Sequence, residues 1–340
     1  MPPSALRRTE RFVTGSTGAG LKILLVKLSS LGDVVHAMPA VQDIRRALPE
    51  ARIDWVVEPA FADLVRRCEG VSRVITCDQR RWRRAPFSAE TRQAFGAFRA
   101  KLQAQAYDSV IDLQGLTKSA LVAWLARLAS GGHRVALGNR TSGSSYEVPT
   151  RWVAHYAVYI PPRIHAVDRS RVLCAHALGY APQGAESFGL RASASPEQAE
   201  VAFVHGTSRA DKLWPEALWV DLGRTLLARG LAIGLPHGSD EERARAERIA
   251  QALGPQARVW PRLPLGELTD RLAACQGVIG IDSGLSHIAT ALHLPHVQIY
   301  NHDTAWRTGP MNRPRQVSVF APPHPSLEAV LAAWEQVTAA

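Results

Sequence analysis

Short apolar runs alternate with helix-like segments along this chain, and the alternation limits the possible folds more than any other feature. In the first half the apolar runs cover residues 22–27, 53–57, 74–75 and 109–113, and the clearest helical spacing lies over 34–48. Strands that alternate with helices in this way form a parallel sheet covered by helices on both faces. The first half is therefore predicted to be α/β, with a doubly wound sheet.

A second alternating series follows a stretch rich in Gly, Ser, Ala and Pro at 182–196. Its apolar runs are 202–205, 231–235, 257–260, 278–281 and 296–300. The last segment, 326–339, has helical spacing and begins at Ser326, a residue type that caps helices. The second half is thus predicted to repeat the architecture of the first.

These patterns, with the length of 340 residues, predict more than one domain. The predicted divisions are a flexible leader at 1–20, an N-terminal domain at 21–185, a C-terminal domain at 196–322, and a final helix at 323–340. Ligands of doubly wound sheets bind beyond the carboxyl ends of the strands, so a cleft between two such halves is the expected binding region.

The composition limits the partners and the cellular location that can be expected for this chain. The net charge of +10 predicts an anionic partner, which nucleic acid, an anionic membrane surface or a phosphorylated substrate would each satisfy; a basic surface without a specific partner is the alternative. No apolar stretch approaches the ~18 residues of a membrane-spanning helix, and residues 1–20 lack the apolar core of a signal peptide. The chain is therefore expected to stay in the cytoplasm, where its four scattered cysteines would be reduced thiols.

The first segment with chemical potential is the loop at 29–33, which follows the first strand and opens a helix. Gly32 is expected to permit a backbone geometry that other residues resist. Asp33, at the carboxyl end of a strand, could take a proton from an attacking hydroxyl. It could equally serve only as a helix cap, and its position alone does not separate these readings.

Two segments in the second half are suited to a phosphate. Residues 282–287 form a Gly-containing turn from a buried strand into a helix, whose free N–H groups and positive end attract anions; taken alone, the turn is more typical of an ordinary capped helix. Residues 205–216 place small hydroxyl side chains and Lys212 just after a strand, which suits a diphosphate, although a polar connecting loop is the alternative. The chain has no Asp-x-Asp pair to hold a divalent metal, which favours stabilisation of a leaving group by helix ends and Lys212.

The run at 80–84 places four arginines around Trp82 in a stretch without clear periodicity. Arginine pairs bidentately with phosphate and carboxylate, so an anionic acceptor is the functional interpretation. A solvated basic loop is the alternative.

These segments occur together, in this order, in the bacterial heptosyltransferase family, which the chain resembles over nearly its full length from Leu21. Three motifs carry the resemblance: 27–36 with Pro39 and Ala40, then Thr207 and Ser208 with 212–215, and 282–287. The segments 80–84 and 112–119 are similar to the branch that adds the first heptose.

The resemblance implies a GT-B fold with two Rossmann-like domains and a C-terminal helix that returns to the first. It implies inverting transfer of heptose from ADP-L-glycero-β-D-manno-heptose to the first Kdo of Kdo2-lipid A. No cofactor or metal is expected, since the Asp-x-Asp pair is missing. The basic charge, the run at 80–84 and the lipid-borne acceptor predict peripheral binding at the cytoplasmic face of the anionic inner membrane. Asp33 would be the general base and Ser30, Gly32, Arg80, Arg81 and Arg84 would contact the acceptor. The implied donor contacts are Thr207, Ser208, Lys212, Glu242, Leu263, Asp282, Ser283, Gly284 and His287.

The chain departs from the family after Tyr300, where relatives usually have Gly-Pro-Thr-Asp-Pro and this sequence has 301–307 instead. Residues 138–151 also match poorly, so the family's acceptor contacts are not carried over to that region. The remaining alternatives are addition of the second heptose, another enzyme with two such halves, and a basic nucleic-acid-binding protein. An epimerase would need Gly-x-Gly-x-x-Gly after the first strand, and 29–33 is not such a turn. No nucleic-acid recognition module is visible, and a gel shift at physiological salt would test that reading.

Overall fold

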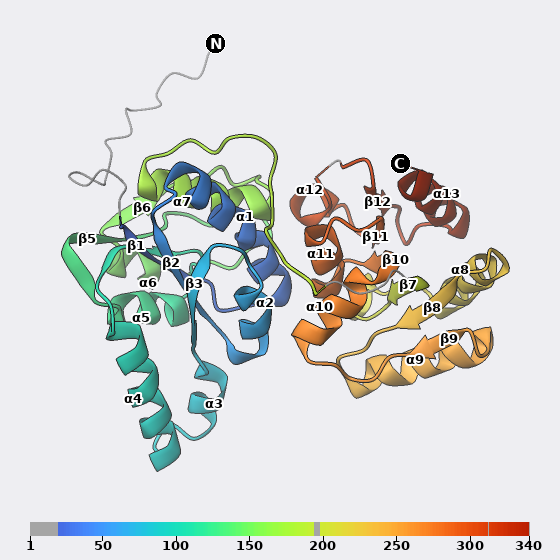
Figure 1. Ribbon diagram of the computed structural model, residues 1–340, viewed down its shortest axis with the longest axis horizontal. Helices are drawn as coiled ribbons and strands as arrows, with labels where there is room; N and C mark the ends of the chain where they lie inside the picture. Colours follow the sequence, from blue (N-terminus) through green and yellow to red (C-terminus); the bar gives the residue numbers. More distant parts are fainter. Residues whose placement is uncertain (1–19, 194–197, 312, 340) are drawn as a thin grey trace, which may run out of the picture. The chain divides into compact units, whose positions relative to one another are not determined.

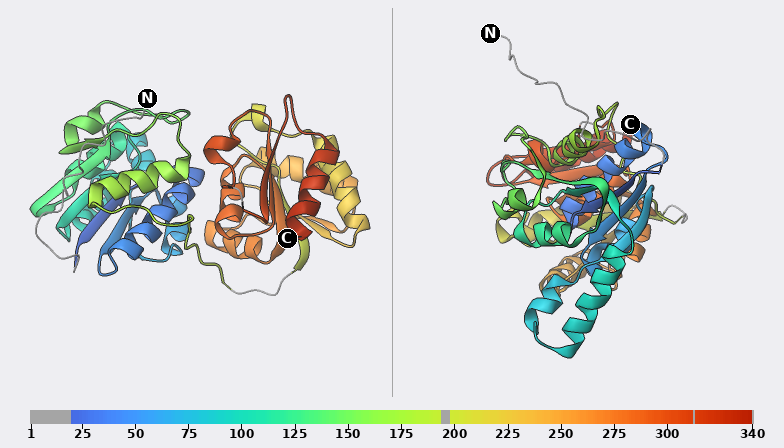
Figure 2. Two further views of the ribbon diagram at one scale, coloured as in Figure 1. Left: turned by 90° about the horizontal axis from the view of Figure 1, so that it is seen from above. Right: turned by 90° about the vertical axis from the view of Figure 1, so that its left-hand side faces the viewer.

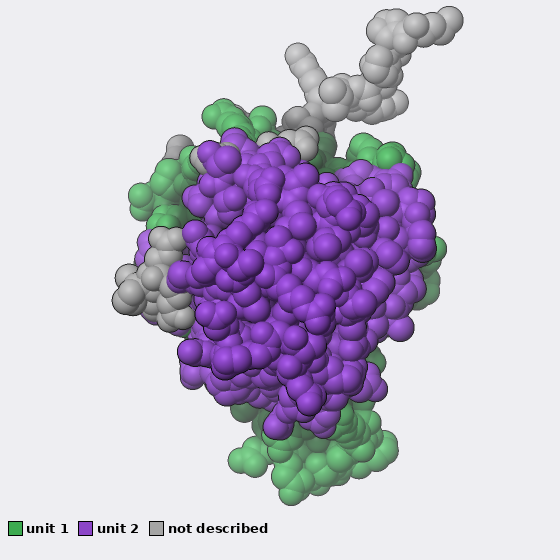
Figure 3. Space-filling view, turned by 90° about the vertical axis from the view of Figure 1, so that its right-hand side faces the viewer, with its two compact units in different colours: residues 1–189 green, residues 190–340 purple. Residues whose placement is uncertain are grey.

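The computed structural model describes residues 20–193, 198–311 and 313–339, and these form two compact units. Unit 1 ends at Gly189 and unit 2 begins at Leu190 (Figure 3). This division falls within 186–195, between the two predicted domains. The predicted leader, apart from Gly20, lies outside the described residues.

The core of unit 1 is a parallel sheet of six strands in the order β3-β2-β1-β4-β5-β6, with helices on both faces (Figures 1 and 2). Its strands are β1 (Lys22–Val26), β2 (Arg52–Val57), β3 (Val71–Thr76), β4 (Tyr107–Asp112), β5 (Leu128–Leu137) and β6 (Tyr156–Val158). Since the chain reverses direction across the sheet between β1 and β4, the loops that follow these two strands flank the switch point where doubly wound sheets bind ligands.

The helical elements of unit 1 are α1 (Leu31–Ala47), η1 (Pro59–Phe61), α2 (Ala62–Arg66), α3 (Gln79–Arg84), α4 (Ala89–Gln103), α5 (Thr117–Leu125), α6 (Pro149–Val153) and α7 (Ala166–Leu178). Helix α1 begins three residues earlier than predicted because Ser30 is its N-cap and the Asp33 carboxylate accepts hydrogen bonds from Ser30. The expectation for Gly32 is therefore wrong: this glycine lies in the first turn of α1 and is not among the residues with positive φ.

Unit 2 repeats the topology, with strand order β12-β11-β10-β7-β8-β9 and all strands parallel. Its strands are β7 (Gln198–Val204), β8 (Ala232–Leu235), β9 (Ala257–Val259), β10 (Cys275–Ile281), β11 (His296–Tyr300) and β12 (Gln316–Phe320). Counted from its own first strand, this order is the same as in unit 1, and the switch point lies between β7 and β10.

The helical elements of unit 2 are η2 (Ala210–Lys212), α8 (Glu216–Ala228), α9 (Asp240–Leu253), α10 (Leu265–Ala273), α11 (Gly284–Ala291), α12 (Ala305–Thr308) and α13 (Leu327–Ala339). The predicted final helix is α13, and Ser326 Oγ accepts a hydrogen bond from Ala329 N, 3.3 Å away. However, α13 packs on β11, β12 and α8 of unit 2 (Figure 2). The expectation that it returns to the first domain is corrected, because Val330, Trp334 and Val337 are buried in the unit 2 core.

Each unit has its own apolar core, built on the runs that predicted its strands. Leu24, Val26 and Val110 are fully buried in unit 1, and Phe203 and Ile279 are fully buried in unit 2. Burying both faces of a strand favours continuous apolar sequence, which explains why these runs were recognisable. Among the described helices, none combines the length and the apolarity needed to cross a bilayer.

Three strands were not predicted. β6 is only three residues long, β5 contains the pair Gly131-Gly132, and β12 has the mixed sequence Gln-Val-Ser-Val-Phe. Their sequences lack the continuous apolar character of the central strands, since β6 and β12 are edge strands and β5 is next to an edge. Pairing with an existing sheet, which is a tertiary effect, fixes these segments as strands.

Candidate functional site

The loops after β1 and β4 are joined directly at the unit 1 switch point. Val26 and Asp112, the last residues of the two strands, are paired in the sheet. Gln114 Oε1 accepts hydrogen bonds from the backbone N–H groups of Leu28 (2.9 Å) and Ser29 (3.2 Å). The position of the loop that leads to Asp33 is thus fixed by a side chain from the neighbouring strand connection.

Asp33 lies in the first turn of α1, and its two carboxylate oxygens have different partners. Oδ2 accepts from Ser30 Oγ at 3.0 Å and from Ser30 N at 3.3 Å. Oδ1 lies 3.3 Å from Lys27 Nζ and 3.3 Å from an Arg169 guanidinium nitrogen. The side chain is 37% exposed, whereas those of Lys27 and Arg169 are 2% and 9% exposed. The partly exposed carboxylate of Asp33 therefore lies between two buried cations, Lys27 and Arg169.

The electrostatics of this cluster follow from burial and charge. Burial acts to raise the pKa of Asp33, but the charges of Lys27 and Arg169 outweigh it and hold the pKa well below its usual range. Burial lowers the pKa of Lys27, and the Asp33 carboxylate opposes that shift. Asp33 is thus ionised at neutral pH, which is the form that a general base requires.

A further chain of polar contacts connects this loop to the arginine-rich segment. Lys118 Nζ donates to Ser29 Oγ at 2.8 Å and lies 3.3 Å from Glu58 Oε1. The other oxygen of Glu58 lies 2.9 Å from Arg80 Nε. Ser29 immediately precedes Ser30, so Arg80 is linked to the Asp33 loop through two buried or half-buried side chains.

The arginine run does not form an irregular loop. It forms helix α3, capped by Asp78, whose carboxylate accepts from Arg81 N at 3.2 Å. Trp82 fixes this short helix because its ring packs on Phe95 and Phe98 of α4, with centroid distances of 5.5 Å and 5.3 Å. The basic side chains of the helix are exposed: Arg80, Arg81, Arg83 and Arg84.

In unit 2, the loops after β7 and β10 meet at the corresponding switch point. Lys212 Nζ, on η2, lies 2.6 Å from Asp282 Oδ2. The other Asp282 oxygen lies 3.5 Å from His287 Nε2 and 3.5 Å from Thr308 Oγ1. Burial acts to raise the pKa of Asp282, but the hydrogen bond from His287 and the charge of Lys212 outweigh it and keep the pKa well below its usual range. The predicted donor residues Lys212, Asp282 and His287 are thus in contact.

The N-terminus of α11 presents unused polar groups beside this ion pair. Ser283 is the N-cap, its hydroxyl makes no side-chain cap hydrogen bond, and Gly284 is the first helical residue. The buried Ser283 Oγ has no hydrogen-bond partner among the described residues. Ser286 Oγ instead donates to the backbone carbonyl of Ile281 at 2.6 Å. A free helix terminus next to a lysine is a suitable site for a diphosphate.

Glu242 lies close to the loop after β7. Its carboxylate caps α9 by accepting from Gly238 N at 2.6 Å and from Ser239 N at 3.3 Å. It also lies against Gly206: a Cβ added there would be 2.5 Å from Glu242 Cδ. Because residue 206 is a glycine, the Glu242 carboxylate can approach the backbone of the loop after β7.

The other predicted donor residues lie on loops. Thr207 and Ser208 follow β7 and are half-buried and exposed, and Leu263 is half-buried in the connection from β9 to α10.

Residues 301–307, which differ from the sequence usual in the family that the chain resembles, contact the loop that carries Lys212. Asn301 Nδ2 donates to the backbone carbonyls of Asp211 (3.3 Å) and Leu213 (2.9 Å), on either side of Lys212. His302 Nε2 lies 3.2 Å from Asp211 Oδ2. Asn301 and His302 thus help to position Lys212, although they differ from the residues usual at these places in the family.

Sequence reasoning assigned no role to Lys27 or Arg169. Lys27 carried a signal, since it is a charged residue directly after a buried apolar strand. Arg169 lies on α7, 136 residues from Asp33, and no local pattern distinguishes it from other helix arginines. The four cysteines are free and buried. Among the described residues, no group of three or more His, Cys, Asp or Glu side chains is arranged to hold a metal ion.

Comparison with known proteins shows which proteins this chain is similar to. Residues 95–329 match the family model of glycosyltransferase family 9 (heptosyltransferase). The chain is 37% identical to lipopolysaccharide heptosyltransferase 1 of Pseudomonas aeruginosa over 307 residues, which cover 86% of this chain and 82% of that protein. It is 38% identical to the Escherichia coli K12 protein of the same name over 290 residues, 82% of this chain and 88% of that protein. Heptosyltransferase 2 of the same strain is 26% identical over 318 residues, 87% of each chain.

Solved structures show the same likeness. E. coli heptosyltransferase WaaC with ADP matches with a TM-score of 0.83 and 33% identity, over 93% of this chain and 100% of that one. WaaC with ADP-2-deoxy-2-fluoro heptose matches with a TM-score of 0.78 and 34% identity, over 93% and 99%. The predicted GT-B class, with two Rossmann-like units, is thereby confirmed.

Proposed function

This chain belongs to glycosyltransferase family 9, the heptosyltransferase family, and on that premise we propose that it moves L-glycero-D-manno-heptose from ADP-heptose to the first Kdo of Kdo2-lipid A. The product belongs to the inner core of lipopolysaccharide. The observation that carries the proposal is the 37–38% identity to proteins named heptosyltransferase 1, against 25–26% for those named heptosyltransferase 2.

The proposed mechanism is a single displacement with inversion. The acceptor hydroxyl attacks the anomeric carbon and passes its proton to Asp33, while the bond from that carbon to the ADP oxygen breaks. Because Lys27 and Arg169 lower the pKa of Asp33, the carboxylate is a weak base toward a free hydroxyl. Proton transfer is therefore expected late, once the new C–O bond has made the hydroxyl acidic.

Charge that develops on the departing diphosphate is met by Lys212 and the N-terminus of α11, so we propose that no metal is needed. In this proposal Asp282 holds Lys212 in place before the donor binds, through their 2.6 Å contact. Thr207, Ser208, Ser283, Gly284 and His287 would complete the diphosphate site. Glu242 would bind the ribose and Leu263 would line the adenine.

The central test is incubation with ADP-heptose and Kdo2-lipid A, with mass detection of one added heptose. Asp33→Ala is expected to lower kcat by about 10²- to 10⁴-fold, the usual contribution of a general base, while ADP binding changes little. Asp33→Asn separates the two roles of this residue, since an amide oxygen can still accept from Ser30 but cannot take the proton. Full activity in Asp33→Asn would contradict the proposal.

We further propose that the protein acts at the cytoplasmic face of the inner membrane, bound peripherally. The exposed arginines of α3 and the net charge of +10 support electrostatic attraction to anionic lipid. Co-sedimentation with anionic vesicles is expected at low salt and should be lost at high salt. Replacing Arg81, Arg83 and Arg84 with Gln should weaken it more than replacing Arg224, Arg243 and Arg248 of unit 2; binding that depends on neither set would contradict this proposal.

A further inference from the structure

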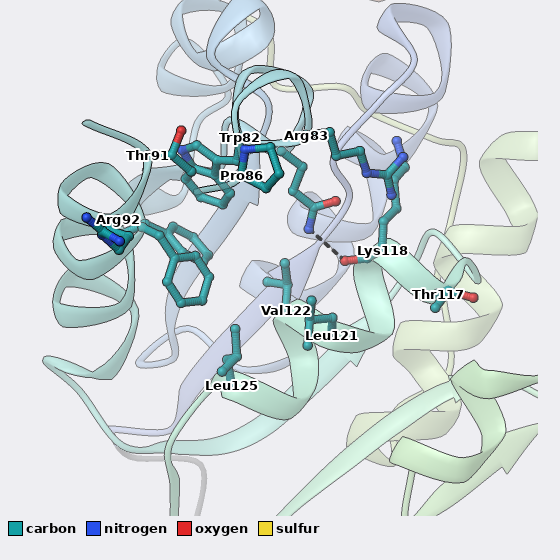
Figure 4. A pocket seen from close by; sticks show the side chains of 13 residues that line it. Trp82, Arg83, Pro86, Thr91, Arg92, Thr117, Lys118, Leu121, Val122 and Leu125 are labelled. Carbon is teal, nitrogen blue, oxygen red and sulfur yellow. Dashed lines mark hydrogen bonds between the residues drawn. The ribbon is translucent and has the colours of Figure 1, made fainter. Parts of the chain in front are cut away.

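Helices α3, α4 and α5 enclose a cavity of about 500 Å³ in unit 1 (Figure 4). Its walls are mainly apolar, with Trp82 of α3 on one side, Phe95 and Phe98 of α4 on another, and Val122 and Leu125 of α5 opposite. The volume falls in the range of roughly 300–1,000 Å³ that is typical of ligand sites. Among the described residues, none of the hydrogen-bond or ion-pair partners given above for Asp33, Lys212 or Asp282 lines this cavity.

The cavity is open to solvent and its rim is basic. Leu121, on the α5 wall, is 48% exposed, and Arg83, Arg92 and Lys118 also line the cavity. Figure 4 shows Lys118 and Leu121 on the same helix, facing Trp82 and Arg83 across the opening. A ligand that matches this arrangement has an apolar chain for the interior and an anionic group for the rim.

Lys118 connects the basic rim to the loop at 29–33. Its ammonium group is 2.8 Å from Ser29 Oγ, and the next residue, Ser30, donates to the Asp33 carboxylate at 3.0 Å. The two walls are also tied together, because Gln79 Nε2 of α3 donates to the Lys118 carbonyl at 2.9 Å. The cavity is therefore connected to the loop that carries Asp33 through Lys118, which lines the cavity and contacts Ser29.

We propose that this cavity binds an acyl chain of the anionic glycolipid acceptor while the sugar of the same molecule lies at Asp33. The proposal rests on the function proposed above and extends it to recognition of the lipid part of the acceptor. The apolar walls would then be covered by chain methylenes, and the rim cations would pair with phosphate or carboxylate groups of the headgroup.

The first test compares Kdo2-lipid A with its fully deacylated form as acceptors of the full-length protein. Each buried methylene favours binding by roughly fourfold, so kcat/KM should be at least about tenfold higher for the acylated acceptor. In Leu121→Glu this ratio should fall below about threefold. The matched control is Trp124→Glu, which changes another exposed apolar residue of α5, one that does not line the cavity, and should keep the ratio.

A ratio near one in the unchanged protein, or a ratio that Leu121→Glu does not lower, would overturn the proposal. Failure to transfer heptose to either acceptor would instead refute the proposed function, and the cavity would then be judged by direct binding alone.

Direct binding is measured with 11-bromoundecyl phosphate, whose bromine quenches nearby tryptophan fluorescence. Saturable quenching is expected in the unchanged protein and in Trp124→Phe, and it should be largely lost in Trp82→Phe. The neutral 11-bromoundecanol should bind at least about tenfold more weakly, since it lacks the charge that the rim would meet. Quenching that persists in Trp82→Phe, or a dimer that the probe dissociates in sedimentation, would show another occupant and overturn the proposal.

Discussion

The two carboxylate oxygens of Asp33 have different partners, which its position in the sequence did not reveal. One carboxylate oxygen accepts from Ser30 and stabilises the start of α1, and the other faces Lys27 and Arg169. Helix capping and a role as base are therefore compatible in one side chain. The lowered pKa of Asp33 favours folding at neutral pH; this contribution is lost only as the pH falls below the ordinary carboxyl pKa of about 3.9 and through the lower folded value. Burial of Lys27, which lowers the pKa of its ammonium group, acts in the opposite direction.

The pH dependence of transfer tests this arrangement. In the unchanged protein Asp33 stays ionised as the pH falls to about 5, so its titration should not limit kcat in that range. Lys27→Met removes a cation 3.3 Å from the carboxylate, which should raise the pKa of Asp33 and move the acidic limb of the kcat profile to higher pH. The measurement is the pH–rate profile with saturating substrates.

The controls for this experiment are Lys27→Arg, which keeps the charge, and Lys101→Met, which removes an exposed lysine elsewhere in unit 1. An acidic limb at the same pH in Lys27→Met and in both controls would mean that Lys27 does not set the ionisation of Asp33. Circular dichroism would establish that each variant is folded.

Among the elements, α3 shows how a single apolar residue positions a charged surface. The helix has six residues and no fully buried side chain, so it is too short to be stable by itself. Trp82 holds it on α4 through Phe95 and Phe98. The arginines on either side of Trp82 are thereby presented to solvent in a fixed arrangement.

Trp82→Ala should therefore weaken acceptor binding without affecting the donor. Loss of the ring packing releases α3, and losing even one charge-assisted hydrogen bond of about 1.5–3 kcal/mol would raise the acceptor KM roughly tenfold or more. The KM for ADP-heptose should change less than about twofold. Steady-state kinetics with each substrate varied in turn give both values, and Phe320→Ala, an exposed aromatic residue of unit 2, is the matched control. Equal increases in both KM values would contradict a role for α3 in acceptor binding.

At the scale of the whole molecule, the two units share a topology but carry different chemistry at the switch point. Unit 1 places a carboxylate between two cations there, and unit 2 places a lysine beside a helix terminus with an unused hydroxyl. The first arrangement suits proton removal and the second suits an anion. The net charge of +10, by contrast, did not distinguish among nucleic acid, membrane and phosphate.

Hydrogen exchange with and without ADP tests which unit holds the nucleotide. At 100 times Kd, ligand stabilises its site by about 2.7 kcal/mol, so peptides that contain 205–212 and 282–287 should exchange more slowly when ADP is present. Peptides that contain 28–33 should change little. In Lys212→Ala, protection at the same ADP concentration should fall because the affinity is lower, and protection confined to the 28–33 loop would refute the assignment of the donor site to unit 2.

The local sequence determined the central strands of the two sheets and the position of the loops that were predicted to carry the chemistry. Continuous apolar runs identified the central strands, because a strand buried on both faces needs such a run, and a loop that follows a strand lies at the ligand-binding edge of a parallel sheet. Only the tertiary structure decided that Arg169 meets Asp33 across 136 residues, that Lys212 pairs with Asp282 across 70, and that α13 belongs to unit 2. It also decided the direction of the Asp33 pKa shift, since electrostatic interaction depends on distance in space and on burial, and neither is encoded in a local pattern.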